Sequence, residues 1–251
     1  MYNDYEERER YRHSNLIIRR YHVKRLISVK SELERILKAY ENGILLDVGC
    51  GDGSYLALLK NKYNFLIGVD ISIRSLKTAK NKTKNMDSGV IEFILADARY
   101  IPIISSSADV VLCSEVLEHI EAPEKVICEL FRVARCLLLI TVPVLNVLRK
   151  LAKITRYANK INELEKYIGH INMNIHSWWI DIISKVANEK KICYDIRPLY
   201  LYITAEPIAS IFAHVNNIPR IISVTLDIME KILSQPLSAN QMIISIFIKR
   251  K

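Results

Sequence analysis

The stretch Ile44-Leu-Leu-Asp-Val-Gly-Cys-Gly-Asp-Gly53 decides the fold of this 251-residue chain. A short aliphatic run leads into a turn in which Gly49, Gly51 and Gly53 alternate with other residues, and a helical pattern follows. Only 7 residues of the chain are Gly, and four of them fall between Gly43 and Gly53. Glycine permits a tight turn and a close approach of a ligand to the backbone. The pattern predicts a ligand-binding turn between a strand and a helix.

Apolar runs alternate with helical patterns along the central part of the chain. Five runs are predicted to be buried strands, at residues 44–48, 65–69, 90–95, 109–113 and 136–142. Their Val, Ile and Leu content, with little polar alternation, is typical of a parallel sheet covered on both faces. The helical patterns between them imply right-handed crossovers, so we expect an α/β fold with a doubly wound sheet. Ser72 is the expected N-cap of one helix, and Pro123 fits the first turn of another.

The flanking segments add helices and two more strands. Before the core, Ser31 and Glu34 fit a capping box for an amphipathic helix that ends near Tyr40. After the core, we expect helices at 145–168, 177–187 and 207–235 and strands at 191–197 and 241–249. Without a repeat or a linker, the chain is predicted to be one domain. Its parts are an N-terminal helical segment (1–42) that folds partly over the ligand, a ligand-binding core (43–143) and an acceptor-side remainder (144–251).

Composition and charge exclude several classes of protein. With 50% hydrophobic and 25% charged residues, the chain has the composition of a globular protein rather than a disordered one. The charged N-terminus does not suit a signal peptide, and no apolar run reaches the length of a membrane span. Five cysteines without a C-x-x-C pair favour reduced thiols in a cytoplasmic protein. The net charge of +9 is concentrated in residues 1–40 and 145–170, which suits solvated helix faces, an anionic substrate, nucleic acid or a peripheral membrane surface.

Acidic residues around the glycine turn discriminate between cofactors. Asp47 and Asp52 flank the turn, where they would repel the pyrophosphate of a nicotinamide cofactor and attract a sulfonium or an ammonium group. The G-x-G-x-G spacing also differs from the G-x-G-x-x-G of dinucleotide sites. Asp70 ends the second strand, 23 residues after Asp47, and can accept hydrogen bonds from both hydroxyls of an adenosine ribose. These features favour S-adenosylmethionine.

Five motifs in the correct order carry a resemblance to a known family. They are Leu45-Leu-Asp-Val-Gly-Cys-Gly-Asp-Gly-Ser54, Ile67-Gly-Val-Asp-Ile-Ser72, Ile94-Leu-Ala-Asp-Ala98 with Ile101-Pro102, Asp109-Val-Val-Leu-Cys-Ser-Glu-Val-Leu-Glu-His119, and residues 133–143. Together they resemble the class I S-adenosylmethionine-dependent methyltransferases, in their broad type 11 branch. The resemblance implies a Rossmann-like sheet of seven strands whose last strand, 241–249, is antiparallel to its neighbours.

The resemblance also implies which residues bind the methionine and ribose parts of the cofactor. Asp47, Gly49 and Gly51 would hold the methionine part, with Asp47 near its ammonium group. Asp70 would accept the ribose hydroxyls. These residues cluster at the carboxyl ends of the strands, where open α/β sheets bind ligands.

By the same resemblance, four further residues would complete the cofactor site. Ile71 would pack on the adenine ring, Asp97 would accept from the adenine amino group, and the Ala98 N–H would donate to a ring nitrogen. Ser114 would lie near the point of methyl transfer.

Glu115, Glu118 and His119 form an E-x-x-E-H motif near that point. At i, i+3 and i+4 they would share one helix face, and could hold a divalent metal with His170 as a further ligand. A similar motif occurs in metal-dependent 2′-O-methyltransferases of small RNA and in quinone-biosynthesis O-methyltransferases. The alternative, which we favour, is that these residues cap, pair or contact the substrate without a metal. Glu115, His119 and His170 are the candidate catalytic residues.

Four functions remain open at this level. The favoured one is methyl transfer to a small-molecule or lipid-like acceptor. The second is methylation of RNA, with the basic segments holding phosphates. The third is binding of S-adenosylmethionine without catalysis, and the fourth, which the acidic turn disfavours, is a nicotinamide-dependent oxidoreductase.

Overall fold

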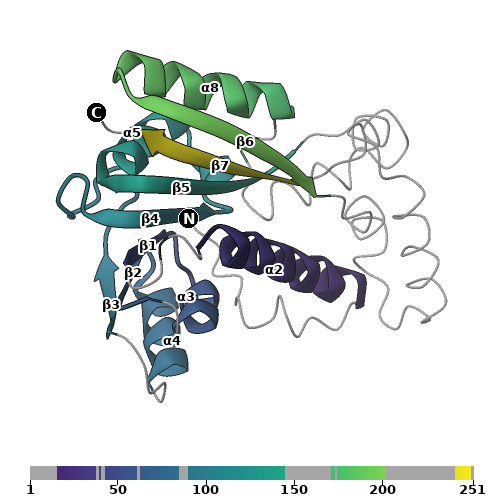
Figure 1. The fold of residues 1–251 in the computed structure, drawn as a ribbon. Coiled ribbons are helices and arrows are strands. Elements are labelled where there is room, and N and C mark those ends of the chain that lie inside the picture. Colours follow the sequence, from purple (N-terminus) through teal and green to yellow (C-terminus); the bar gives the residue numbers. More distant parts are fainter. Residues whose placement is uncertain are drawn as a thin grey trace.

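Seven strands form one sheet in the order β3-β2-β1-β4-β5-β7-β6 (Figure 1). The computed structural model describes residues 16–37, 40, 43–60, 63–84, 90–144, 171–172, 174–201 and 241–249. The strands are β1 (Ile44–Val48), β2 (Phe65–Asp70), β3 (Val90–Leu95), β4 (Ala108–Ser114), β5 (Ala134–Pro143), β6 (Cys193–Leu201) and β7 (Gln241–Lys249).

The strand order reverses beside β1. From β1 the chain proceeds outward through β2 and β3, then returns to the other side of β1 as β4 and continues to β5, with all of these pairs parallel. β7 is antiparallel to both of its neighbours, β5 and β6. The predicted doubly wound sheet with an antiparallel last strand is confirmed. In such sheets, ligands bind outside the carboxyl ends of the strands where the order reverses.

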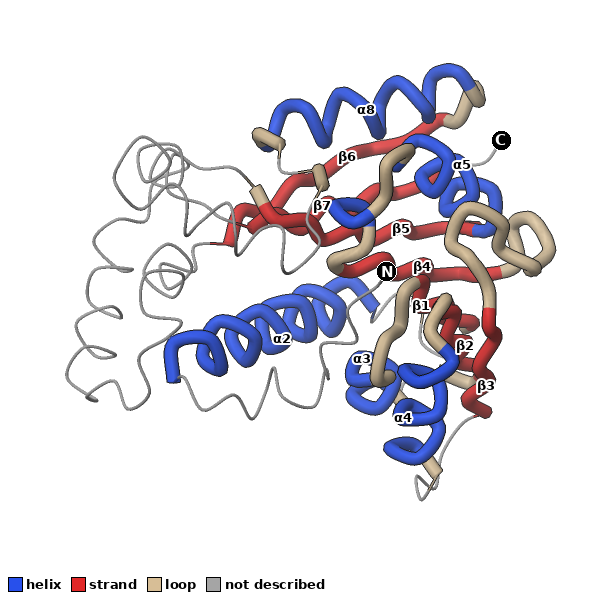
Figure 2. Tube along the Cα trace, turned by 180° about the vertical axis from the view of Figure 1, so that it is seen from behind, coloured by secondary structure: helices blue, strands red, loops and turns tan. Residues whose placement is uncertain are grey.

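Helices cover the sheet on both faces. The described helices are α2 (Leu16–Leu37), α3 (Ser54–Leu59), α4 (Ile73–Thr83), the 3₁₀ turn η1 (Leu117–His119), α5 (Pro123–Val133) and α8 (His176–Glu189). α5 and α8 lie on one face, and α2, α3 and α4 lie on the other (Figures 1 and 2). Two of the expected helix starts are confirmed: Ser72 accepts a hydrogen bond from the Ser75 N–H, and Pro123 occupies the first turn of α5.

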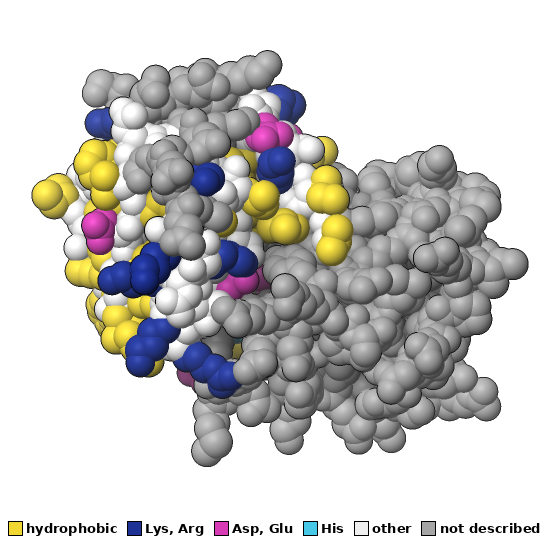
Figure 3. Space-filling view, turned by 90° about the horizontal axis from the view of Figure 1, so that it is seen from below, with side chains coloured by type: hydrophobic (Ala, Val, Ile, Leu, Met, Phe, Trp, Pro, Cys, Tyr) yellow, Lys and Arg dark blue, Asp and Glu magenta, His cyan; other side chains and the backbone are white. Residues whose placement is uncertain are grey.

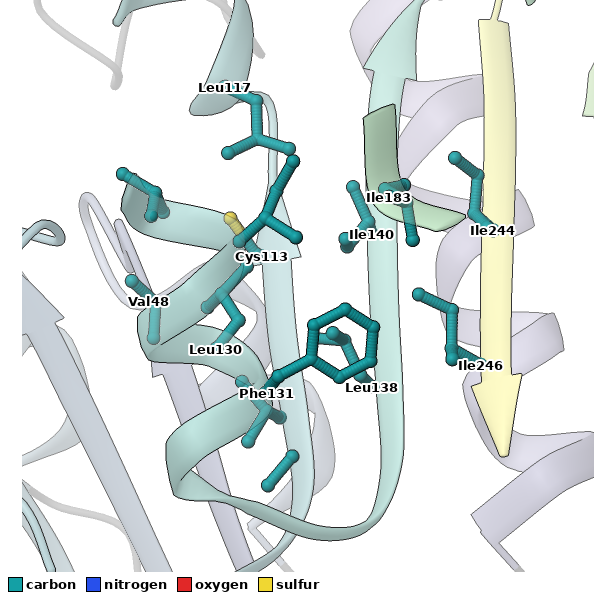
Figure 4. Packing of buried hydrophobic residues seen from close by; sticks show 14 of the residues in the cluster. Val48, Cys113, Leu117, Leu130, Phe131, Leu138, Ile140, Ile183, Ile244 and Ile246 are labelled. Carbon is teal, nitrogen blue, oxygen red and sulfur yellow. The ribbon is translucent and has the colours of Figure 1, made fainter. Parts of the chain in front are cut away.

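Two hydrophobic cores result from this layering. Leu138 and Ile140 of β5 pack with α5 and α8 in the core that Figure 4 shows, together with Phe131 and Ile183. The alternate β5 residue Leu139 packs with α2 and α3 on the opposite face. Because side chains of one strand point to both faces, each central strand must be apolar at successive positions. This explains why the strands appear in the sequence as continuous apolar runs.

The predicted capping box at Ser31 and Glu34 is wrong. α2 begins at Leu16, so both residues lie within the helix, where Ser31 is exposed and Glu34 pairs with Lys30. The same S-x-x-E spacing arises on the exposed face of a continuing helix whose other face is buried, here through Val29 and Leu33.

Three other expectations concern residues that the structure does not describe. The helices predicted at 145–168 and 207–235, and the start of the N-terminal segment, lie outside the described residues. Among the residues that are described, no helix has the length and apolar character that a membrane span requires.

Candidate functional site

The glycine turn after β1 has a backbone that favours glycine at three positions. Gly49, Gly51 and Gly53 have φ angles of 74°, 53° and 70°. The N–H groups of Gly49 and Cys50 donate to the Val69 carbonyl at 2.7 and 3.0 Å, which ties the turn to β2. A Cβ atom on Gly49 would lie 2.3 Å from Val116 Cγ2. Gly49 is therefore required both by its backbone angle and by the packing of the segment that follows β4.

Asp70, at the carboxyl end of β2, holds the same turn with its side chain. Its Oδ2 accepts a hydrogen bond from the Gly51 N–H at 2.8 Å, and its Oδ1 accepts one from the Ser72 N–H at 2.8 Å. Burial raises the pKa of this carboxyl, against hydrogen bonds from Ser72, Gly51 and Ile71 that lower it. An ionised carboxylate has about four acceptor sites, so these bonds leave capacity to accept from ribose hydroxyls.

Asp52 does not act as the sequence suggested. Lys82 Nζ of α4 donates to Asp52 Oδ2, and the Ser54 N–H and hydroxyl donate to Asp52 Oδ1 at 3.1 and 2.6 Å. Lys82 also donates to Ser54 Oγ at 2.8 Å. The charge of Asp52 is thus compensated by Lys82, and the residue anchors the start of α3. Of the two acids that were expected to attract a cation at the turn, only Asp47 can still have that role.

The segment after β3 brings a carboxylate to the same edge of the sheet. Asp97 accepts hydrogen bonds from the Arg99 N–H at 2.8 Å and from the Arg99 guanidinium at 2.6 to 3.1 Å. These side-chain bonds lower the pKa of Asp97, so it stays ionised and acts as an acceptor. The Ala96 N–H donates to the Asp70 carbonyl at 3.1 Å, which aligns this segment with the end of β2. Ile71, also at this edge, is 56% exposed.

Arg132 of α5 fixes the remainder of the segment after β3. Its Nη1 donates to the Ile103 carbonyl and its Nη2 to the Ile101 carbonyl, both at 2.7 Å. Glu129 pairs with Arg132 and accepts from the Ile101 N–H at 2.9 Å. This clamp joins the segment that carries Asp97 and Ala98 to α5, with which Ile101 also shares a hydrophobic core. Neither Arg132 nor Glu129 was among the residues that the sequence singled out.

Three carboxylates lie near the carboxyl ends of β1 and β4. Asp47 and Glu118 are buried, at 1% and 0% exposure, and Glu115 is partly exposed. Burial raises the pKa of the Cys113 thiol well above its ordinary value, and the charges of Glu118, Asp47 and Glu115 raise it further. The three carboxylates therefore lie close enough to one buried thiol to act on it together.

Hydroxyl groups connect β4, β5 and α3 beside these acids. Ser114 Oγ lies 2.8 Å from Thr141 Oγ1 and 3.4 Å from the Tyr55 hydroxyl. Thr141 donates to Glu115 Oε1 at 3.2 Å. That Ser114 lies near the point of methyl transfer stays a prediction, and the sequence analysis did not single out its neighbours Tyr55 and Thr141. Thr141 is a polar residue within the apolar run 136–142, and this position could have indicated a special role. Because threonine is common in strands, the residue did not stand out.

The predicted helix face formed by Glu115, Glu118 and His119 is wrong. The helical turn begins at Leu117, and Glu115 precedes it with a φ of 56°, so the three residues do not follow helical spacing. Within the part of the chain that the structure describes, no group of three or more His, Cys, Asp and Glu residues is arranged to hold a metal ion. His170 lies outside the described residues.

The segment before α8 contacts η1 directly. The N–H groups of Ile171 and Asn172 both donate to the Glu118 carbonyl at 2.9 Å, and Asn172 Nδ2 donates to the Ile120 carbonyl. The backbone of the E-x-x-E-H segment thus anchors the chain where it enters α8.

Comparison with known proteins identifies the central part of the chain. Residues 46–136 match a family model described as a methyltransferase domain. A malonyl-(acyl-carrier protein) O-methyltransferase from Hamiltonella defensa subsp. Acyrthosiphon pisum is 30% identical over 91 residues, covering 36% of this chain and 33% of that protein. A tRNA (carboxymethyluridine(34)-5-O)-methyltransferase from Arabidopsis thaliana is 36% identical over 95 residues, covering 37% of this chain and 21% of that protein. The chain matches about a third or less of the length of these relatives.

A solved structure extends the likeness over nearly the whole chain. Magnesium protoporphyrin IX methyltransferase from Synechocystis PCC 6803, crystallised with bound SAH, superposes with a TM-score of 0.63. The match covers 98% of this chain and 96% of that one, at 17% sequence identity. At this identity the likeness shows a shared fold.

Proposed function

We propose that this chain, whose residues 46–136 match a methyltransferase domain, transfers a methyl group from S-adenosylmethionine to a small-molecule or lipid-like acceptor. The observation that carries the proposal is the convergence of the glycine turn, Asp70 and Asp97 at one edge of the sheet. This edge is where a doubly wound sheet binds its ligand.

The residues present fit the adenosine part of the cofactor. Asp70 would accept the ribose hydroxyls while it holds the turn through Gly51. Exposed Ile71 would cover one face of the adenine, and burial of its side chain would favour binding by about 1.5–3 kcal/mol. Asp97, ionised beside Arg99, would accept from the adenine amino group, and the Ala98 N–H would donate to the ring. Adenosine offers hydroxyl and amino donors and an apolar ring face. The carboxylates and the apolar side chain at this edge match these groups.

The opposite end of the site fits a cation. S-Adenosylmethionine carries a sulfonium and an ammonium group, and Asp47 lies at the end of the strand that leads into the turn. The carboxylates whose charges reach the Cys113 thiol give this end a negative potential. Opposite charges a few ångströms apart attract strongly at a site with reduced water access. A pyrophosphate at this position would be repelled.

Positioning supplies most of the catalytic effect that this chain can provide. The cofactor, when bound, supplies an electrophilic methyl group. Asp47 and the glycine turn would orient its methionine part, and Ser114 would lie beside the transfer point at the end of β4. Methyl transfer is an in-line displacement, so holding the acceptor in line with the methyl–sulfur bond contributes a large part of the rate.

Calorimetry tests this function directly. We expect wild-type protein to bind S-adenosylmethionine and S-adenosylhomocysteine, and not NAD. Incubation with cofactor labelled in the methyl group and a panel of acceptors should then give a labelled small-molecule product. Tight binding of NAD, or cofactor binding without methylation of any acceptor, would contradict the proposal.

One observation favours RNA as the alternative acceptor. Exposed basic residues occupy α4 and its C-terminal end, and residues 73–84 contain no acidic side chain. The basic residues are Arg74, Lys77, Lys80, Lys82 and Lys84. Figure 3, seen from the side that carries α3 and α4, shows Lys and Arg side chains gathered on this face. Such a face can hold phosphates, although solvated helix faces have the same composition. Transfer of labelled methyl groups to RNA, or its absence, distinguishes the two acceptors.

A further inference from the structure

The backbone of Glu115 adopts a conformation that residues with side chains rarely adopt. Its φ is 56°, directly after the last residue of β4. Such conformations persist where the surrounding structure holds them, and they gather at active sites and ligand clamps. Here β5 holds the residue, because the Glu115 N–H donates to the Thr141 carbonyl at 3.1 Å. The direction of the Glu115 side chain is therefore set by the sheet.

The same threonine also holds the Glu115 carboxylate. Thr141 Oγ1 donates to Glu115 Oε1 at 3.2 Å, and Thr141 is fully buried. Ser114 Oγ, at 2.8 Å from Thr141 Oγ1, continues the hydroxyl chain toward Tyr55. A carboxylate only accepts, so the Thr141 proton is directed at Glu115.

Glu115 lies next to the turn that would hold the cofactor. The following residue, Val116, packs so closely on Gly49 that no Cβ atom fits between them. β4 is also the direct neighbour of β1 in the sheet. Of the three carboxylates around Cys113, Glu115 is partly exposed, whereas Asp47 and Glu118 are buried. A molecule approaching the transfer point from solvent would therefore meet Glu115.

We propose that Glu115 is the catalytic base of the methyl transfer and that Thr141 is its positioning residue, an inference that rests on the proposed function. The acceptor oxygen or nitrogen forms a bond to the methyl carbon as the carbon–sulfur bond breaks, and that electron pair stays on sulfur. The proton of the acceptor O–H or N–H passes to the Glu115 carboxylate. An acceptor carboxylate has no such proton at neutral pH and is repelled by Glu115. The acceptor therefore reacts through a hydroxyl or an amine.

Three variants and three acceptor panels test this inference. Wild type, Glu115→Gln, Thr141→Val and Thr141→Ser are assayed with methyl-labelled cofactor against panels of alcohols and phenols, amines, and carboxylic acids. Thermal melts establish that each variant is folded, and calorimetry measures its affinity for S-adenosylmethionine. Thr141→Val removes the hydroxyl at nearly constant shape, and Thr141→Ser keeps it.

The expected results separate the base from its positioning residue. Wild type should methylate an alcohol, phenol or amine, and Glu115→Gln should lower kcat at least 100-fold with cofactor affinity within threefold. Loss of the Thr141 hydroxyl should lower kcat about tenfold in Thr141→Val, with KM and cofactor affinity unchanged, because the Glu115 carboxylate is no longer held in place. Thr141→Ser, which keeps the hydroxyl, should restore kcat.

Other outcomes overturn the inference. They are preferred methylation of carboxylic acids, methylation of other acceptors but of no hydroxyl or amine, kcat within threefold in Glu115→Gln, or equal kcat in Thr141→Val and Thr141→Ser. A wild-type protein that does not bind S-adenosylmethionine would instead overturn the proposed function itself.

Discussion

Asp70 combines two tasks in one carboxylate. Both of its oxygens already accept backbone hydrogen bonds at 2.8 Å, from Gly51 and Ser72. In the proposed complex they also accept the ribose hydroxyls. The ordering of the turn and the recognition of the ribose therefore depend on the same charge. Because burial raises the pKa of Asp70, that charge is lost at a higher pH than for an ordinary aspartate.

The first prediction concerns this charge. Asp70→Asn should weaken S-adenosylmethionine binding by about 10- to 100-fold, because hydrogen bonds to a charged partner contribute about 1.5–3 kcal/mol. In wild type the ionised form is the one that binds. Affinity should therefore fall as the pH drops through the raised pKa, starting above the ordinary value of 3.8. Calorimetry across pH checks both points, with Asp181→Asn on the exposed side of α8 as the control. Equal losses in the two variants would contradict the role of Asp70.

A second prediction concerns Gly49. Gly49→Ala should lower the free energy of unfolding by about 2–4 kcal/mol, because it combines a positive φ with a Cβ atom 2.3 Å from Val116 Cγ2. Urea unfolding of Gly49→Ala, Val116→Ala and the double variant separates these causes. The double variant should be more stable than the sum of the single losses predicts, since it removes the clash and keeps the backbone strain. Additive losses would mean that no clash occurs.

At the scale of elements, the chain between β3 and β4 depends on α5. Arg132 donates to the carbonyls of Ile101 and Ile103 through two separate nitrogens, a geometry that a lysine ammonium cannot reproduce. Asp97 and Ala98 lie in the same connection. The position of the residues that we propose to bind adenine therefore depends on contacts with a helix that carries none of the proposed cofactor-binding residues.

The third prediction tests this connection. Arg132→Met should lower stability by about 1–3 kcal/mol, because buried carbonyls lose their donors. It should also increase hydrogen exchange of residues 97–103 and weaken S-adenosylmethionine binding severalfold. Arg132→Lys should fall between wild type and Arg132→Met. If Arg132→Met lost stability but kept full affinity and normal exchange at 97–103, the clamp would be structural only.

The sequence predicted well those elements whose structure depends on residues that are adjacent along the chain. A buried parallel strand needs successive apolar residues, so β1 to β5 were predicted within about two residues at each end. Glu115 was placed on a helix because its spacing to Glu118 is helical, yet its backbone is set by pairing with Thr141. Asp52 was assigned to the ligand because Lys82, thirty residues later, is brought to it only by the fold. Contacts between distant residues are not encoded in a local pattern.

At the scale of the whole molecule, basic and acidic side chains of the described residues gather at different places. The net charge is +9, and basic side chains cover the face of α4, whereas Asp47, Glu115 and Glu118 gather at the carboxyl ends of β1 and β4. A cationic cofactor is attracted to the acidic edge. A polyanion is attracted to the basic face, which is formed by a different element. If methyl transfer takes place at the acidic edge, as we propose, these carboxylates would repel a phosphate backbone there, and a small acceptor would be preferred over RNA.

The last prediction follows from this separation. Single-stranded RNA should bind weakly through the basic face, with an affinity that falls steeply as salt rises, because phosphate contacts release counterions. Lys77→Glu, Lys80→Glu and Lys84→Glu together should abolish that binding and leave S-adenosylmethionine affinity unchanged, since no cofactor contact is assigned to them. Methylation of a small acceptor in 150 mM salt should be the same with and without excess RNA. A different result would contradict this prediction: labelled methyl groups on the RNA that are lost in the triple variant. The basic face would then serve the reaction, and the acceptor would be a nucleic acid. Its reacting base or ribose would have to reach past α4 to the acidic edge.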